Sequence, residues 1–341
     1  MLSIPPASRS ELTALAEATE AFGYDALWLA DERFHFDPYA ALTYCATRTT
    51  RIGLGVCVTD PYSRHPALTA MAIGALDHLS DGRALLGIGA GGSGFAEMGV
   101  ARPKPARAMA EAIDVIRALL RGERVTQQGD VVGFHKGKLD FAPLRADVPV
   151  YVASQNALGL RVAGQVADGA IMQGCVNEPM LRFFADEVAA GRQRAGRTVE
   201  AVERVARIDV AIADDRRAAL DAVRPNVAVT LLFQKPTFAS FVQAGLEIPH
   251  DLLDLIAEIP PTRDPAVTRP IAAHIPDAWV EAFIIAGDAG SVAQQVTDVL
   301  RHDIDHFLLR PVAIGGDRIE PLRRFAQEVL PRVRSQLEES R

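Results

Sequence analysis

GVCVTDPYSRHP, residues 55–66, is the end of an apolar run that passes into a polar loop between two prolines. The run Ile52–Val58 is apolar on both faces, as a strand of a parallel sheet buried beneath helices must be. Pro61 and Pro66 then force a stiff, extended exit from that strand. The pattern therefore predicts a buried parallel strand that ends in a rigid loop.

Polar side chains gather directly after this strand. Thr59, Asp60 and Arg64 place hydrogen-bonding groups and a cation where the strand ends. Ligand sites are built at this end of the strands in α/β barrels. An ordinary loop in which Asp60 begins a turn fits the same residues.

Short apolar runs of this kind recur along the chain, with longer helical patterns between them. Besides Ile52–Val58, the runs are Leu2–Ile4, Ala26–Ala30, Ala84–Ile88, Val148–Ala153, Gly169–Met172, Val205–Ala213 and His306–Leu309. Eight strand–helix units predict an α/β fold of the (β/α)8 TIM-barrel class, whose site lies on the loops after the strands.

Helical periodicity marks the segments between several of these runs. The helical segments are Ser10–Phe22, with a Ser cap before Glu11, and Arg107–Arg121, Met180–Arg194, Ser291–Leu300 and Ile319–Val333. Val125–Leu144 is typical of a hairpin. Residues 225–276 form a long, proline-punctuated insertion that could be a lid, an interface arm or a plain surface insertion. We expect residues 1–341 to form a single domain.

Composition narrows the class of protein. The 341 residues are 49% hydrophobic and 23% charged, which is typical of globular chains, and the net charge of −7 argues against a nucleic-acid-binding protein. Cys45, Cys57 and Cys175 lie far apart, which fits a reducing cytosol and predicts neither a disulfide framework nor a metal site. The sequence has no 18-residue apolar run and no signal peptide, so we expect a cytoplasmic protein without a membrane span.

The opening segment resembles the third-strand signature of the luciferase-like flavin and deazaflavin oxidoreductases. It is most similar to the methylenetetrahydromethanopterin reductase branch, where a TNPYTRHP-like stretch stands at this place. The resemblance continues through Ala67–Ala90 and extends to Asp25–Asp31, Lys104–Glu123, Pro149–Gly169, Glu281–Gly287 and the C-terminal PVAIGGD stretch. It implies an oxidoreductase on a TIM barrel.

The resemblance also implies a special backbone feature after the third strand. In this family a non-prolyl cis peptide forms a bulge that supports one face of the tricyclic cofactor ring, and by position it falls at Cys57–Val58 here. Thr59, Asp60 and Arg64 then meet the ring. Alternatively, Cys57 is only a small buried residue.

The second strand ends in Asp31-Glu32-Arg33. Many relatives have Asp-His at this point, reaching the polar end of the ring or the substrate, and Asp31 fits that pattern. Glu32 departs from it, which removes a near-neutral acid–base group. His35 could substitute, so Asp31, Glu32 and His35 are the catalytic candidates. A solvated carboxylate at Glu32 and a structural His35 are the alternatives.

Glycines dominate residues 87–94, GIGAGGSG, which contain a GxGxxG pattern. A dinucleotide-binding unit would carry this pattern in its first βαβ unit, so that interpretation is disfavoured. We expect the backbone of Gly91, Gly92 and Ser93 to approach the side chain or phosphate of the cofactor. Some deazaflavin relatives have an acid where Gly92 stands, and this chain lacks it.

Two further strand ends are candidate phosphate sites. Family resemblance places the ribityl phosphate at Ser154-Gln155-Asn156, where Asn156 could cap a helix, and at Gly174-Cys175. The alternative role is caps and turns only. Arg310, after the last strand, could meet an anionic tail, and the rim could add Arg33, Arg64, Arg102, Lys104 and Arg107, although solvated loop ends fit equally.

Three functions remain open from the sequence. The first is hydride transfer between coenzyme F420 and an unidentified small organic substrate. The second is an FMN-dependent monooxygenase, and the third is a barrel that binds a flavin without turnover, because the His after Asp31 and the acid at Gly92 are missing. We expect neither nucleic acid nor membrane as a partner. Family resemblance implies a homodimer or a higher homo-oligomer.

Overall fold

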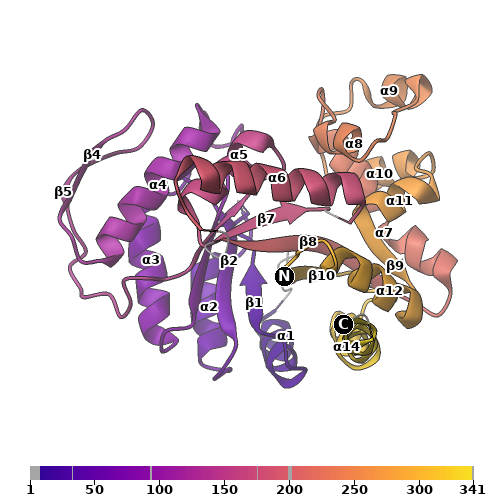
Figure 1. Ribbon diagram of the computed structural model, residues 1–341, viewed down its shortest axis with the longest axis horizontal. Coiled ribbons are helices and arrows are strands. Elements are labelled where there is room, and N and C mark those ends of the chain that lie inside the picture. Colours follow the sequence, from indigo (N-terminus) through magenta and orange to yellow (C-terminus); the bar gives the residue numbers. More distant parts are fainter. Residues whose placement is uncertain (1–7, 33, 93, 175, 199–201, 340–341) are drawn as a thin grey trace. The chain divides into compact units, whose positions relative to one another are not determined.

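The computed structural model describes residues 8–32, 34–92, 94–174, 176–198 and 202–339. Across these residues, parallel strands alternate with helices along the chain (Figure 1). The parallel strands described are β1 (Ala26–Leu29), β2 (Gly53–Thr59), β3 (Ala84–Ile88), β6 (Val150–Ala153), β7 (Gly169–Gln173), β8 (Glu203–Ile212), β9 (Ile284–Gly287) and β10 (His306–Pro311). Each strand is followed by a helix, so the predicted (β/α)8 class is confirmed.

A helix follows each of these parallel strands along the chain. These helices are α2 (Pro38–Ala46), α3 (Pro66–Leu79), α4 (Pro105–Leu120), α5 (Ala157–Val166), α6 (Glu178–Arg194), α7 (Arg216–Phe233), α12 (Ala289–Leu300) and α13 (Glu320–Arg324). Among the described residues, no helix is long and apolar enough to cross a membrane.

Two details of the strand and helix assignment differ from the sequence prediction. β9 was not predicted, because its apolar residues follow directly on helix α11 (Asp277–Phe283) and no turn residue separates them. The predicted strand Leu2–Ile4 lies outside the described residues. Helix α1 (Arg9–Ala21) is capped by Ser8, whose hydroxyl accepts from the Glu11 amide at 3.2 Å, so the predicted cap at Ser10 was wrong.

By internal contacts the chain divides into unit 1, Met1–Ile171 with Glu187–Arg204, and unit 2, Met172–Asp186 with Val205–Arg341. In unit 1 the strands β1, β2, β3, β6 and the start of β7 are neighbours in that order, all parallel. Trp28 of β1 stands opposite Gly55 of β2, and a Cβ on Gly55 would overlap the indole ring. This glycine of the opening segment therefore lets two strands pack around a tryptophan.

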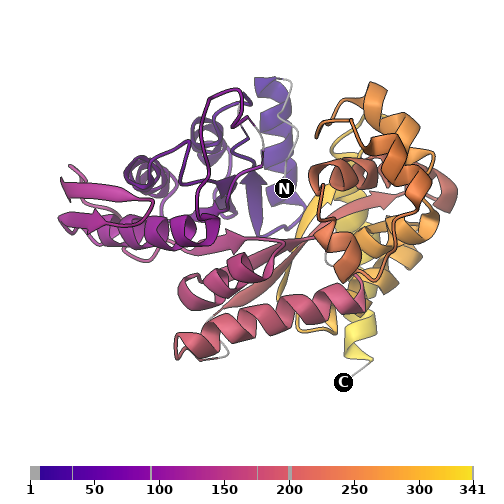
Figure 2. The same cartoon turned by 90° about the horizontal axis from the view of Figure 1, so that it is seen from above.

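The predicted hairpin is confirmed as the antiparallel pair β4 (Val125–Gln128) and β5 (Gly133–Gly137). It lies against α4 at the outer side of unit 1 (Figure 2). Buried Glu111 of α4 accepts the amides of residues 130, 131 and 132 at 2.8, 3.0 and 2.9 Å. His65 Nε2 also lies 3.0 Å from the Gly133 carbonyl oxygen, so the hairpin is attached to two helices.

In unit 2, β8 lies between β9 and β10 in a parallel sheet. Helix α7 continues through Pro225 to Phe233, so the irregular insertion begins later than the predicted residue 225. After α7 come the short helices α8 (Ala239–Gln243), α9 (His250–Ile256) and α10 (Pro265–Ala272). Lys235 links the end of α7 to the end of α9, because its ammonium donates to the carbonyl oxygens of Ile256 at 2.7 Å and Ile259 at 2.6 Å.

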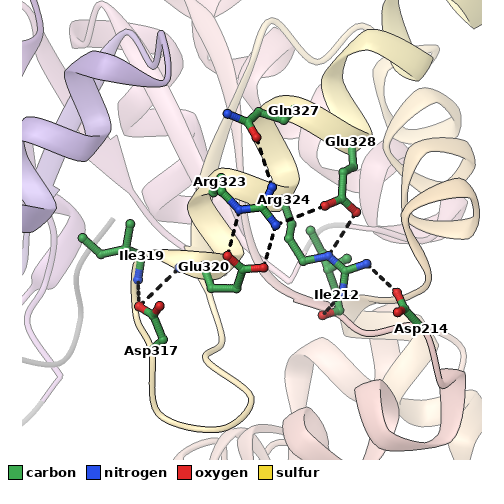
Figure 3. Close-up of polar contacts among 9 residues, drawn as sticks. All are labelled: Ile212, Asp214, Asp317, Ile319, Glu320, Arg323, Arg324, Gln327 and Glu328. Carbon is green, nitrogen blue, oxygen red and sulfur yellow. Dashed lines mark hydrogen bonds and ion pairs between the residues drawn. The ribbon is translucent and has the colours of Figure 1, made fainter.

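The C-terminal segment was predicted as one helix over Ile319–Val333, but it contains α13, a π-helical turn (Phe325–Val329) and α14 (Leu330–Glu338). Pro331 has no N–H for the regular helical bond, which accounts for the break. Arg324 joins this segment to the end of β8 through the Asp214 carboxylate at 2.6 Å and the Ile212 carbonyl (Figure 3).

Candidate functional site

The candidate site in unit 1 is built where β1, β2 and β3 end. The peptide bond between Cys57 and Val58 is cis, as the family resemblance implied. The pairing register of β2 with β3 shifts between Val56 and Thr59, so the strand bulges at this bond. Cys57 is buried and the Val58 side chain is half-buried. The predicted bulge is thereby confirmed.

The first two glycines of the GIGAGGSG stretch accommodate this bulge. A Cβ on Gly87 would lie 2.6 Å from the Val56 carbonyl oxygen, and one on Gly89 would lie 2.8 Å from a Val58 methyl group. Real Cβ atoms do not approach neighbours so closely without displacing them. Gly87 and Gly89 are therefore needed for strand packing, a role that sequence reasoning did not assign to them.

The rest of the glycine stretch is a loop that Arg102 contacts. Gly91 has a φ of +73°, a conformation natural to glycine, and its carbonyl accepts from Arg102 Nη1 at 2.7 Å. The Arg102 guanidinium also lies 4.6 Å from the centre of the Phe95 ring. A Cβ on Gly92 would meet nothing within 4 Å, so this residue borders open space. Ser93 lies outside the described residues.

Asp31 follows β1 and belongs to a charged cluster that the sequence predicted only in part. Its Oδ2 atom lies 3.4 Å from Arg64 Nε, and Arg64 Nη2 lies 2.7 Å from Asp37 Oδ2. The guanidinium of Arg64 stands 4.7 Å from the centre of the Tyr39 ring. The structure thus brings together the predicted Asp31 and Arg64. It adds Asp37, which caps α2, and Tyr39, which lies in the first turn of α2.

Two buried hydroxyl groups lie beside Asp31. Thr59 and Tyr39 are 0% and 6% exposed, and neither Thr59 Oγ1 nor Tyr39 Oη forms a hydrogen bond of regular geometry. Burial raises the pKa of the Asp31 carboxyl, while the Thr59 hydroxyl and the Arg64 charge act against that rise. Burial also raises the pKa of the Tyr39 phenol. Buried polar atoms normally have partners, so these hydroxyls mark a place for a polar ligand.

Asp60 is buried and shapes the loop after β2. Its Oδ1 atom accepts the amides of Tyr62 and Ser63, each at 2.8 Å, and its Oδ2 atom accepts the Ser63 hydroxyl at 2.6 Å. These contacts show Asp60 starting a turn, which was the alternative to a cofactor contact that the sequence left open. Its predicted contact with a cofactor stays a prediction.

Glu32 and His35 lie in the turn after β1. The His35 amide donates to the Glu32 carbonyl oxygen at 3.2 Å, and Phe34 between them has a φ of +70°. Both side chains are half-buried. The catalytic roles predicted for these two residues stay predictions. Arg33 lies outside the described residues.

The predicted phosphate segments have the local structure of caps and turns. Asn156 caps α5, with its Oδ1 accepting the Gly159 amide at 2.9 Å, as the sequence predicted. Ser154 Oγ accepts the Asn156 amide at 3.2 Å, and Gln155 lies between them. In unit 2, Gly174 has a φ of +66° and donates to the Arg207 carbonyl at 2.9 Å. Cys175 lies outside the described residues, and binding of phosphate at these segments stays a prediction.

The cations predicted at the rim have partners within the protein. Lys104 pairs with Asp130 at 3.1 Å, and Arg107 pairs with Glu111 at 2.7 Å. In unit 2, Arg310 of β10 pairs with the buried Asp209 of the neighbouring β8, so its side chain is engaged inside the sheet. These pairs reduce the charge that the side chains offer to an anionic tail.

Unit 2 also contains a separate cavity of about 580 Å³ beside α7 and α10. Its most buried charged residue, Arg224, donates to the Ile275 carbonyl and to the carboxylates of Asp221 and Asp277. The guanidinium is thus engaged by the walls of the cavity. Most of the site residues predicted from the sequence lie in unit 1, whereas Gly174 and Arg310 lie in unit 2 and do not line this cavity.

Sequence reasoning missed Asp37 and Tyr39. Asp37-Pro38 was a readable signal for a helix start, because Asp is a preferred cap and Pro suits the first helical position. The structure confirms the cap, with Asp37 Oδ1 accepting the Ala40 amide at 2.9 Å. The contact of Asp37 with Arg64 had no local signal, since the two residues lie 27 positions apart.

Comparison with known proteins places this chain among related sequences. The model of the luciferase-like monooxygenase family matches residues 3–305. A 5,10-methylenetetrahydromethanopterin reductase of Methanolobus tindarius is 34% identical over 328 residues, covering 92% of this chain and 94% of the relative. An F420-dependent glucose-6-phosphate dehydrogenase of Nakamurella multipartita is 30% identical over 344 residues, covering 96% and 93%.

A solved structure shares the fold over almost its whole length. The coenzyme F420 dependent tetrahydromethanopterin reductase from Methanopyrus kandleri superposes with a TM-score of 0.85 at 24% identity. The match covers 97% of each chain. This likeness shows that the chain has the fold of that enzyme.

Proposed function

The chain belongs to the luciferase-like monooxygenase family, and we propose that it is an oxidoreductase transferring a hydride between the deazaflavin coenzyme F420 and a small organic substrate. The observation that carries the proposal is similarity over more than nine-tenths of the chain to an F420-dependent dehydrogenase and a methylenetetrahydromethanopterin reductase. Fold alone would not support it, because one fold hosts many activities.

The residues of the candidate site fit a flat ring with a polar edge. The β2 bulge presents the half-buried Val58, and the unpartnered hydroxyls of Thr59 and Tyr39 lie beside the carboxyl of Asp31. A ligand that both donates and accepts hydrogen bonds would give these hydroxyls the bonds of regular geometry that they do not form within the protein. This combination of an apolar support and a few polar groups is typical of cofactor sites.

When bound, F420 supplies a ring carbon that accepts or donates the hydride. The protein's contribution is to hold the reacting partners in place. The bulge of β2 between Val56 and Thr59 would support one face of a bound ring and would leave the other face to the substrate. Thr59 and Tyr39 would orient its polar edge, and the loop at Gly91 and Gly92 would admit a backbone approach to the rest of the cofactor.

Asp31 is the residue of this site best suited to hold a proton. Burial raises the pKa of its carboxyl above that of an exposed aspartate, and Arg64 limits the rise. The protonated fraction of Asp31 is thus larger at a given pH than that of a solvated carboxyl. Glu32 and His35 remain the other candidates for proton transfer.

Equilibrium titration with the two cofactors tests the proposal. We expect F420 fluorescence to change saturably on adding the protein, with a dissociation constant at least tenfold below that of FMN. The second candidate, an FMN-dependent monooxygenase, is favoured by the family's description. Tight FMN binding without measurable F420 binding would overturn the first proposal in favour of the second. Binding of F420 without hydride transfer to any acceptor would favour a non-catalytic barrel.

A further inference from the structure

We propose that Asp37 and Tyr39 are positioning residues for Asp31. They hold the Arg64 guanidinium close enough to Asp31 to act on its charge, while the short hydrogen bond of Arg64 goes to Asp37 and not to the Asp31 carboxyl group. This inference rests on the proposed function, which makes Asp31 part of the cofactor site.

Arg64 lies between two carboxylates and engages them unequally. Its Nη2 atom lies 2.7 Å from Asp37 Oδ2, a strong charge-assisted hydrogen bond, whereas its Nε atom lies 3.4 Å from Asp31 Oδ2. A forked guanidinium can bind one carboxylate through two parallel bonds, and this geometry is common for Arg–Asp pairs. Asp31 does not receive that fork here, because Arg64 directs its hydrogen bond to Asp37.

The position of Arg64 follows from the start of α2. Asp37 uses its two oxygens separately, since Oδ1 accepts the Ala40 amide at 2.9 Å and Oδ2 accepts Arg64. The Tyr39 ring is buried in the first turn of the same helix and lies 4.7 Å from the guanidinium carbon. The helix start therefore fixes the cation by a hydrogen bond and by ring stacking together.

The consequence for Asp31 is that a cation stands nearby without forming the two parallel bonds of an Arg–Asp fork, and the Thr59 hydroxyl is the other polar group beside the carboxyl. The described groups of unit 1 that act on Asp31 are Thr59, Arg64 and Asp60 from β2 and the loop after it, and Asp37 from the cap of α2. Burial raises the pKa of Asp31 most. Thr59 and Arg64 lower it, and Asp37 and Asp60 raise it. Moving Arg64 onto Asp31 would tip this balance toward the ionised form.

The Asp37→Asn variant tests the proposal, because asparagine also caps helices well and the start of α2 is preserved. Without its ionic partner, Arg64 is expected to turn to Asp31. The titration midpoint of the Asp31 carboxyl, followed by ¹³C NMR and assigned with Asp31→Asn, should fall by about one pH unit. Loss of the Asp37 charge itself accounts for part of this fall, so the position of Arg64 in the variant decides between the two causes. A crystal structure of the variant should show a guanidinium nitrogen about 2.8 Å from Asp31.

Further variants separate positioning from a general structural role. Arg64→Met removes the cation and should raise the Asp31 midpoint. Tyr39→Leu removes the stacking ring together with its hydroxyl and should lower the midpoint, while Tyr39→Phe keeps the ring and should not. Asp298→Asn removes one carboxylate of an exposed pair in unit 2, with Arg301, and should leave the midpoint unchanged. An unchanged midpoint in both Asp37→Asn and Tyr39→Leu, with folded protein, would overturn the proposal.

The titration is done on cofactor-free protein, which separates this inference from the proposed function. F420 binding to the unaltered protein is measured alongside. A shifted Asp31 midpoint together with no F420 binding would mean that the positioning is real and the proposed function is wrong. Normal F420 binding with no shift in either variant would mean the reverse.

Discussion

Two buried hydroxyl groups without a hydrogen bond of regular geometry distinguish the candidate site at the scale of single residues. A buried polar atom without a hydrogen bond destabilises a fold by about 1–3 kcal/mol, so such atoms are rare in native proteins. Thr59 and Tyr39 carry two of them within one cluster, beside the half-buried Asp31. Polar groups left open in this way are characteristic of ligand sites, where stability is given up for binding.

Replacing the Thr59 hydroxyl by a methyl group separates binding from stability. In Thr59→Val we expect the free energy of unfolding of the cofactor-free protein to be unchanged or to rise by about 1 kcal/mol, since no regular hydrogen bond is lost. The dissociation constant for F420 should rise about tenfold. Urea denaturation and fluorescence titration measure the two effects.

Thr49→Val is the matched control for this substitution. The Thr49 hydroxyl is also buried, but it donates to the Cys45 carbonyl and accepts from Arg83, each at 2.9 Å. The control should lose about 1–3 kcal/mol of stability and keep its F420 affinity. If Thr59→Val were destabilised as much as Thr49→Val, the Thr59 hydroxyl would be a structural group and not a ligand group.

Gly87→Ala probes the packing behind the bulge. The added Cβ would lie 2.6 Å from the Val56 carbonyl oxygen, so β2 and β3 would have to move apart. We expect the free energy of unfolding to fall by about 1–3 kcal/mol, as overpacking generally costs. Gly133→Ala, where a Cβ meets nothing within 4 Å, is the control and should stay within about 0.5 kcal/mol of the parent. Equal stability of the two variants in urea would contradict the packing role.

Residue-level prediction from the sequence succeeded where a motif fixes the backbone and failed where a side chain chooses a distant partner. The Cys57–Val58 bond was placed correctly because the segment carries a family signature with its own spacing. Asp37 and Tyr39 were missed because their contacts with Arg64 exist only after α2 has packed beside the β2 loop. Local patterns contain no information on such pairings.

At the scale of elements, Glu111 attaches the β4–β5 hairpin to α4. Burial alone would raise the pKa of this carboxyl, but three backbone amides and Arg107 lower it to about 2. The folded value lies below the unfolded value of about 4.3, so the stabilisation is present above the unfolded pKa. It is lost progressively as the pH falls from about 5 toward 2.

Glu111→Gln should therefore destabilise the protein most at neutral pH. We expect a loss of about 2 kcal/mol at pH 7, since the bonds to the one remaining acceptor oxygen become weaker neutral ones and the new NH2 group cannot accept the amides that faced the other oxygen. The difference from the parent should shrink as the pH is lowered below about 5. Glu123→Gln, in an exposed pair with Arg121, is the control and should change stability by less than about 1 kcal/mol. A stability difference independent of pH would refute the role of the charge.

Element boundaries were predicted well where turn residues mark them. β3 spans Ala84–Ile88 as predicted, because a glycine turn precedes it and a glycine-rich loop follows. β9 was missed because the chain passes from α11 into the strand without a break. The C-terminal helix was predicted as one element because its apolar positions repeat regularly, and the interruption before Pro331 appears only when backbone bonding is considered.

At the scale of the whole molecule, the family and the fold are shown by similarity along nearly the entire chain. Strand and helix order was largely predictable because seven of the eight parallel strands described could be read from hydrophobicity, and only β9 was missed. The choice between F420 and FMN was not, because both cofactors present a similar tricyclic ring to the same kind of bulge. The choice of cofactor depends on contacts with the part of the cofactor outside the ring. The predicted cations Lys104 and Arg107 are already paired with carboxylates of the protein, so they offer little charge for such contacts.

A crystal structure of the protein with F420 bound is the most direct test of the central claim, that the ring binds against the β2 bulge. We expect one face of the ring to contact Val58 and its polar edge to lie within about 3.2 Å of the Thr59 hydroxyl or the Asp31 carboxyl. A ring bound elsewhere, with Thr59 and Tyr39 still unpartnered, would contradict the claim.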